Sequence, residues 1–172
     1  ISMPVAMTEE GPDMDQVEQL VKSDQLIKGI WCVPKYANPN GVVYSDAVVS
    51  RFAALAKIAG ANFRIMWDNA YAEHHLVDNP PELANLLSLC EQQGTLDSAI
   101  VIGSTSKITF AGAGMAFIAS SESNIKQFAD YLGISTIGPD KVNQLRHVRF
   151  LKDMDGLRSL MQQHRAFRAE AG

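Results

Sequence analysis

The sequence predicts an α/β domain in which a mostly parallel sheet is flanked by helices. Apolar runs of strand length alternate along the chain with longer segments whose apolar residues recur at helical spacing, and this alternation is typical of parallel sheets. Most of the runs end in polar and turn-forming residues, at the position where open α/β sheets bind ligands. The chain has 172 residues, 47% of them hydrophobic, which suits one well-packed domain and is too short for two large ones.

The first half of the chain supplies three predicted strands. A short strand over residues 5–7 is followed by a helix that Asp13 caps, because an aspartate side chain can accept hydrogen bonds from the first free N–H groups of a helix. The second strand spans residues 30–34. Ser45 caps the next helix, and a third strand over residues 63–67 then follows.

The next segment repeats the helix and strand, and then departs from the parallel pattern. Pro80 and Pro81 are predicted to begin a helix that Gly94 ends. The run 99–102 has no alternation of apolar and polar residues, which predicts a strand covered on both faces. Only a short connection separates it from a further apolar run at 115–119. Because parallel strands need a long crossover, the last strand is predicted to be antiparallel.

The remainder of the chain is predicted to be helical. Three segments carry an apolar stripe, over residues 122–132, 139–151 and 153–168. The glycines that punctuate them are Gly133, Gly138 and Gly156.

Composition excludes several classes of function. The net charge of −4 and a pI near 5.5 provide no general attraction to nucleic acid or to an anionic membrane, so neither is an expected partner. Cys32 and Cys90 lack metal-ligand spacing, which predicts no metal site and favours a reducing, cytoplasmic location. His147 and His164 also lack ligand partners at useful spacing, and the adjacent pair His74 and His75 is predicted to lie in a solvated turn.

Polar side chains follow three of the predicted strands, where they could line one crevice. They are Asn38 after the second strand, Asp68 and Tyr71 after the third, and Ser104, Ser106 and Lys107 after the fourth. An amide, a carboxylate, a phenol, hydroxyls and an amine could face one planar, phosphorylated ring. This set suits pyridoxal 5′-phosphate (PLP), and all six residues are therefore candidate cofactor-binding residues.

Three short motifs in this order resemble those of one enzyme family. Asn38–Gly41 is similar to Asn-Pro-Thr-Gly, Asp68–Tyr71 to Asp-x-Ala-Tyr, and Ser104–Lys107 to Ser-x-Ser-Lys. The sequence thereby resembles the fold-type I PLP enzymes, specifically class I aminotransferases of the aspartate aminotransferase kind. The flanking segments 31–36 and 107–114 resemble a divergent bacterial, MocR-like branch of that family.

The resemblance implies a role for each candidate residue. Lys107 would be the catalytic residue, forming the Schiff base (internal aldimine) with PLP and then moving the proton between the substrate Cα and C4′. Asp68 would pair with the pyridine nitrogen, and Tyr71 and Asn38 would hydrogen-bond the 3′-oxygen of the ring.

Phosphate binding is the point where the sequence departs from the family. The resemblance gives this role to Ser104 and Ser106. The family usually adds an arginine about eight residues after the lysine, whereas residues 114–116 here are Gly-Met-Ala. The sequence does not indicate what replaces that arginine.

The same resemblance implies a domain organisation and a reaction. Residues 1–150 would be part of the PLP-binding large domain, and residues 151–172 a C-terminal helix leading toward an absent small domain. The complete enzyme, a homodimer, would transfer an amino group between an amino acid, with aspartate favoured, and a 2-oxo acid. This segment alone would be inactive.

Other functions stay open at this point. One is another fold-type I PLP reaction, catalysed by a lyase or decarboxylase, because the lysine and aspartate serve any chemistry that needs a stabilised Cα carbanion. A second is the PLP-binding effector domain of a MocR-type regulator, which would bind the cofactor without turnover. A nucleotide-binding or scaffold domain is disfavoured because no GxGxxG motif precedes a helix.

Overall fold

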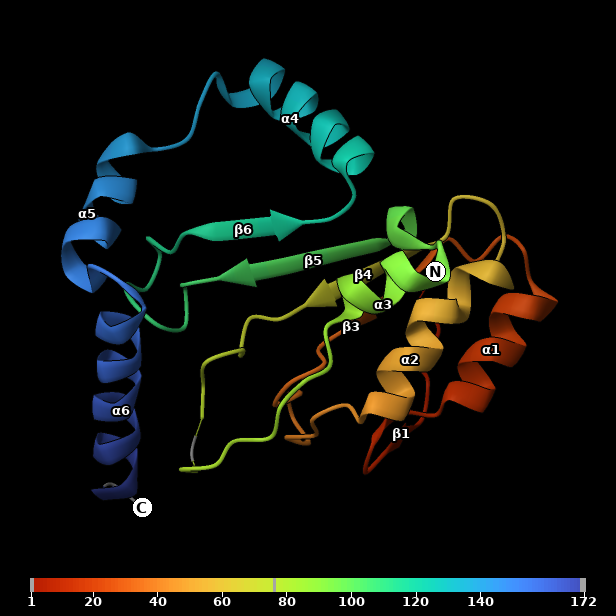
Figure 1. The fold of residues 1–172 in the computed structure, drawn as a ribbon, viewed down its shortest axis with the longest axis horizontal. Coiled ribbons are helices and arrows are strands. Elements are labelled where there is room, and N and C mark those ends of the chain that lie inside the picture. The colour runs from red at the N-terminus through yellow and green to blue at the C-terminus, as the bar shows by residue number, and fades with distance from the viewer. Residues whose placement is uncertain (1, 76, 171–172) are drawn as a thin grey trace.

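A computed structural model of the chain describes residues 2–75 and 77–170 (Figure 1). Ile1, Leu76 and residues 171–172, which close the predicted C-terminal segment, lie outside the described residues. The strands are β1 (Met7–Thr8), β2 (Gly11–Pro12), β3 (Gly29–Cys32), β4 (Arg64–Asp68), β5 (Ala99–Ser104) and β6 (Ala116–Ala119). The helices are α1 (Met14–Ser23), α2 (Asp46–Ala54), α3 (Leu86–Gln93), α4 (Glu122–Thr136), α5 (Lys141–Leu151) and α6 (Met154–Glu170), with 3₁₀ turns at Leu55–Lys57 and Leu96–Ser98.

The main sheet has the strand order β3-β4-β5-β6 and confirms the predicted fold class. The pairs β3–β4 and β4–β5 are parallel. Strand β6 runs antiparallel to β5, with Ser104 opposite Ala116, as the short connection predicts. The first predicted strand does not join this sheet. Strand β1 instead pairs with β2 in a separate antiparallel hairpin, in which each strand has two residues.

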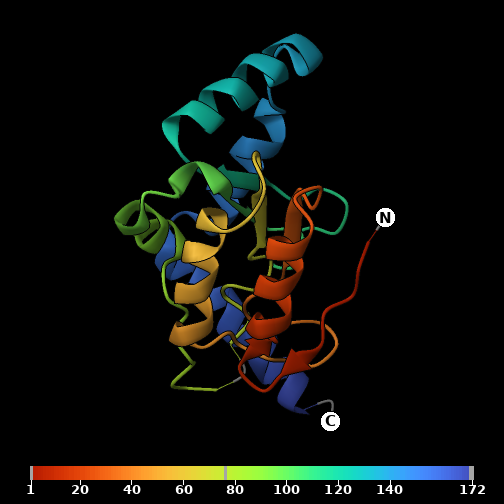
Figure 2. The same cartoon turned by 90° about the vertical axis from the view of Figure 1, so that its right-hand side faces the viewer.

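Three helices form one layer on the sheet and enclose the hydrophobic core. Figure 2 shows α1 and α2 side by side on this face, and α3 packs against the same buried cluster. Side chains alternate along β4, so Ile65 and Trp67 point into the layer and are almost fully buried. The Trp67 ring contacts Phe52 and Tyr44 edge to face, with centroids 5.4 and 5.6 Å apart. These contacts fix the orientation of the strand that carries Asp68.

The opposite face of the sheet is less covered than the sequence predicts. Trp31 on β3 keeps 62% of its surface exposed. In the run 99–102 only Ala99 is buried, and the next three residues are half-buried. The prediction of a strand buried on both faces is therefore wrong for the described residues, since an unbroken apolar run does not say what packs on each side.

Local hydrogen bonding confirms some predicted helix boundaries and corrects others. Asp13 and Ser45 cap α1 and α2 as predicted, and Gly94 ends α3 with a left-handed backbone, φ +71°. The predicted helix start at Pro80-Pro81 is wrong. Helix α3 begins at Leu86, because the Asn85 side chain accepts a hydrogen bond from the N–H of Ser88 at 3.1 Å.

The last three helices lie away from the core. Helix α4 buries none of its side chains, and it is attached through its first turn, where Ser123 and Asn124 donate to the side chain and backbone of Asp97. Gly133 and Gly156 lie within α4 and α6, so only Gly138 separates two helices as predicted. No helix within residues 2–75 or 77–170 has the length and apolar character needed to cross a bilayer.

Candidate active site

The carboxyl ends of β4 and β5 place two predicted site residues at one edge of the sheet. Asp68 is the last residue of β4, and it is in register with Ile102, two residues before the end of β5 at Ser104. The backbone N–H of Asn69 donates to the Ile102 carbonyl at 2.8 Å, which keeps the strands together past Asp68. Because parallel strands end at the same edge, Asp68 and the start of the serine turn lie at one edge of the sheet.

Ser104 and Ser106 form a hydroxyl pair at the start of the turn that carries Lys107. Their Oγ atoms are 2.7 Å apart, and the N–H of Ser106 donates to Ser104 Oγ at 3.0 Å. Gly114 packs directly on Ser106: a Cβ there would lie 2.7 Å from the Cα of Ser106. Only glycine fits at position 114 without displacing the turn.

Lys107 is exposed, and its amine is available for chemistry. Among the described residues, no hydrogen bond or ion pair involves its Nζ atom. A primary amine without a fixed partner can serve as nucleophile and as base once it is deprotonated.

The segment after β4 brings Tyr71 next to the lysine turn. Asp68 Oδ1 accepts from the N–H of Ala70 at 3.2 Å, which shapes the bend leading to Tyr71. The rings of Tyr71 and His74 meet edge to face at 5.4 Å. His74 Nε2 lies 3.2 Å from the backbone oxygen of Lys107, and because a carbonyl can only accept, the nitrogen donates.

A second histidine ties the loop after β3 to the same segment. The Tyr36 hydroxyl and His75 Nδ1 are 3.0 Å apart. The predicted solvated turn for His74 and His75 is therefore wrong, since both side chains are half-buried and hold neighbouring segments. Asn38 lies exposed in this loop, and no hydrogen bond among the described residues joins it to the other five predicted site residues.

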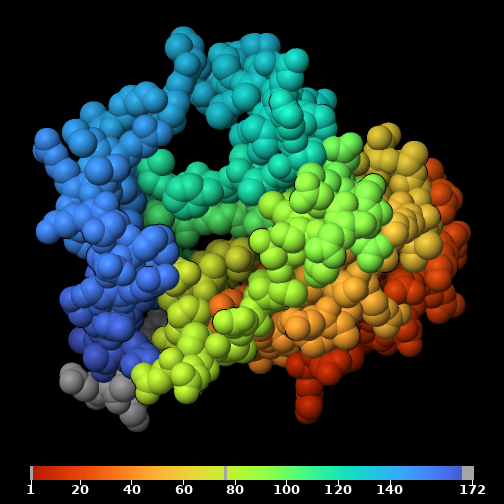
Figure 3. Space-filling view, viewed as in Figure 1, coloured from red at the N-terminus to blue at the C-terminus, as the bar shows by residue number. Residues whose placement is uncertain are grey.

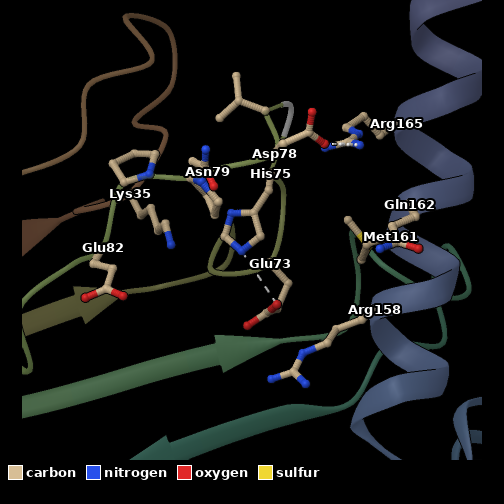
Figure 4. Close-up of a pocket in the computed structure, with 13 residues that line it drawn as sticks. Lys35, Glu73, His75, Asp78, Asn79, Glu82, Arg158, Met161, Gln162 and Arg165 are labelled. Atoms are coloured by element: carbon tan, nitrogen blue, oxygen red, sulfur yellow. Dashed lines mark hydrogen bonds and ion pairs between the residues drawn. The ribbon is translucent and has the colours of Figure 1, made fainter.

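A charged cleft borders this region between the segment after β4 and α6 (Figure 4). Its volume is about 680 Å³, and none of the six predicted site residues lines it. Arg165 of α6 forms an ion pair with Asp78 at 2.7 Å.

Burial lowers the pKa of His75, and the nearby Lys35 lowers it further, against the opposing effect of Glu73. The imidazole of His75 therefore favours its neutral form in the fold.

The sequence analysis missed one buried residue that contacts the lysine turn. His147 of α5 is 6% exposed, and its Nε2 atom lies 3.1 Å from Thr105 Oγ1 and 2.8 Å from Thr109 Oγ1. The available signal is a histidine within a predicted helix. Metal-ligand spacing along the sequence does not detect hydrogen bonds between a histidine and threonine side chains.

The donor set at the strand ends fits a phosphorylated pyridine aldehyde. An exposed amine at Lys107 suits an aldehyde carbon, the Asp68 carboxylate suits a protonated ring nitrogen, and Tyr71 suits a ring oxygen. The paired hydroxyls of Ser104 and Ser106 suit phosphate oxygens. The segment 112–115 contributes no basic side chain.

Comparisons with known proteins agree with this chemistry. The family model for aspartate amino-transferase matches residues 2–170. A candidate aminotransferase of Mycolicibacterium smegmatis is 51% identical over 95% of this chain, and an aspartate aminotransferase of Corynebacterium glutamicum is 46% identical over 96%. The crystal structure of an aspartate transaminase from C. glutamicum covers 95% of this chain with a TM-score of 0.90 and 44% identity. The chain spans 38% of the length of each of these three proteins.

Proposed function

The chain belongs to the aspartate aminotransferase family, and on that premise we propose that it forms the cofactor-binding part of a PLP-dependent aminotransferase. The reaction would move an amino group between an amino acid and a 2-oxo acid. The observation that best supports the proposal is the contact between two motif segments: His74, three residues after Tyr71, donates to the backbone of Lys107. The relatives favour this function over the regulator domain, the lyase and the decarboxylase.

Each site residue has a distinct task in this proposal. Lys107 would hold PLP through its amine and, once released, would move the proton at the substrate Cα. Asp68 would keep the proton on the pyridine nitrogen, and Tyr71 and Asn38 would orient the ring through its 3′-oxygen. When bound, PLP supplies an electron sink for the bond that breaks at Cα.

The hydroxyl pair would anchor the other end of the cofactor. Ser104 and Ser106 already share one hydrogen bond, and Ser106 lies against Gly114, so this pair is held in place before phosphate binds. A preorganised pair loses less conformational freedom on binding than two mobile side chains would.

The domain assignment and partners are part of the same proposal. Residues 1–150 would belong to the PLP-binding large domain, and residues 151–172 would lead toward a small domain. A cytoplasmic homodimer is proposed, of the MocR-like branch. Aspartate is proposed as donor, because the relative from C. glutamicum that is 46% identical is an aspartate aminotransferase.

The test uses the natural chain that contains this sequence, with Lys107→Ala and, as a matched control, Lys126→Ala at an exposed lysine of α4. PLP is added, its absorption is recorded, and borohydride reduction is followed by peptide mapping. We expect a label at Lys107 in the parent and in Lys126→Ala, and none there in Lys107→Ala.

Amino transfer from aspartate to a 2-oxo acid is measured on the same samples. Loss of an acid–base group predicts a fall of about 10²–10⁴-fold or more for Lys107→Ala. An absorption change and a reducible label that persist unchanged in Lys107→Ala would remove Lys107 from its proposed role.

A further inference from the structure

Helix α5 contacts the lysine turn, which follows β5. Figure 1 shows α5 beside the connection between β5 and β6. Its buried His147 meets two hydroxyls with one ring nitrogen, at Thr105 and Thr109. These threonines flank Lys107, two residues before it and two residues after it. One imidazole therefore holds both ends of the segment that presents the amine.

The hydrogen bonds around His147 define its tautomer. Nδ1 lies 2.9 Å from the Asn143 carbonyl, and a carbonyl only accepts, so Nδ1 carries the proton. In the neutral ring, Nε2 then has one lone pair, which the Thr105 and Thr109 hydroxyls share, and the Thr109 proton is also shared with the Thr105 carbonyl oxygen at 3.2 Å. Thr105 Oγ1 itself accepts from the N–H of Met115 at 2.7 Å, which leaves its own proton for His147.

The backbone of Thr105 also forms the hydrogen bonds that close the lysine turn. Its carbonyl accepts from the N–H groups of Ile108 and Thr109, both at 2.9 Å. Lys107 lies inside this closed turn, so its backbone position depends on where Thr105 is held. Thr105 is 5% exposed, and water does not offer its hydroxyl a ready substitute for His147.

A second side chain of α5 holds the loop on the other side of the serine pair. Asn143, one helical turn before His147, donates to the Ala113 carbonyl at 2.9 Å. The neighbouring Gly114 packs on Ser106. Two residues on one face of α5 thus hold the lysine turn and the loop that confines the serines.

We propose that His147 is a positioning residue that locks the lysine turn through Thr105 and Thr109. Its effect on chemistry rests on the proposed role of Lys107, whereas its effect on the turn does not. Misplacement of a reacting group by about 1 Å can cost about 10²-fold in rate, so a lock on the residues two positions before and two positions after Lys107 has a measurable consequence.

Amide hydrogen exchange on the natural chain without added PLP tests the lock itself. His147→Phe keeps a ring against Phe110 but removes both nitrogens. We expect exchange of peptides covering residues 105–115 to rise about tenfold, with β4 unchanged. His147→Gln, which retains an acceptor, should give a smaller rise, and His164→Phe on the exposed side of α6 should give none. Thr109→Val removes a turn-side partner and should act in the same direction.

The second measurement is the rate at which PLP is captured at Lys107, trapped by borohydride. We expect a fall of about tenfold in His147→Phe, with partial recovery in His147→Gln. If residues 105–115 of His147→Phe exchange amide hydrogen at the rate of the parent protein, His147 does not lock the turn. Faster exchange with parental capture would overturn the positioning role. If even the parent and His164→Phe show no label at Lys107, the proposed function fails, while exchange still decides whether His147 holds the turn.

Discussion

The helical layer over the sheet and the helices after β6 both carry apolar residues at helical spacing but differ in packing. The buried hydrophobic side chains among the described residues run from Met14 to Ile108. Helix α1 buries Met14, Val17 and Val21, whereas α4 leaves Phe128, Tyr131 and Ile134 at 42%, 71% and 88% exposure. Figure 3 shows an opening between the α4–α5 segment and β6. An apolar stripe therefore identifies a helix without identifying what covers it.

The two regions should differ most in how much stability the protein loses when a phenylalanine ring is removed. Phe52→Ala deletes a fully buried ring that contacts Trp67 and Tyr44, and large-to-small core changes of this type cost about 3–5 kcal/mol. Phe167→Ala removes a ring that is 73% exposed and should change stability by about 0.5 kcal/mol or less. Urea unfolding measures both. Equal losses would show that the two regions are packed alike.

A buried hydroxyl gives a smaller contrast. Thr95 Oγ1 donates to the Ala53 carbonyl at 2.6 Å and joins the segment after α3 to the end of α2. Thr95→Val should destabilise the protein by about 1–3 kcal/mol, because a buried carbonyl loses its donor. The matched change Thr136→Val affects an exposed hydroxyl that bonds within α4, and should be close to neutral. If Thr136→Val destabilises the protein strongly and Thr95→Val does not, the helices after β6 are packed more tightly than the helical layer.

The smallest expected effect is a pH dependence at His75. Burial lowers the pKa of this histidine from its ordinary 6.5, and Lys35 adds to the shift. The unfolded state then binds a proton at a higher pH than the fold does. The stability from neutral His75 is present above pH about 6.5 and decreases as pH falls through the folded pKa. An NMR titration should place the His75 midpoint below 6.5, and a midpoint above 6.5 would contradict this.

The sequence predicts the strands of the main sheet better than the packing around them. The runs that form β3, β4 and β5 are apolar because at least one face meets the helical layer, and the antiparallel direction of β6 follows from the short connection between β5 and β6. The two prolines predict too early a start for α3, because the side chain that caps this helix belongs to Asn85.

For the candidate site, residue types and their order along the chain predict six residues, whose roles stay predictions, and the strand pairing brings Asp68 and Ser104 to one edge of the sheet. The links made by His74, His75 and His147 were not predictable from spacing. Each joins residues more than thirty positions apart, and such pairs are set by how the strands are placed in space.

The antiparallel β6 has a consequence for the order of folding. Ser104 pairs with Ala116, so the lysine turn lies at the tip of a hairpin closed by residues 105–115. Closing a loop of this size costs little chain entropy, and hairpins form within about 1–10 μs. Asp68 comes beside the turn only through the longer β4-to-β5 crossover. The amine therefore belongs to a locally encoded unit, and the carboxylate is brought to it by slower, long-range contacts.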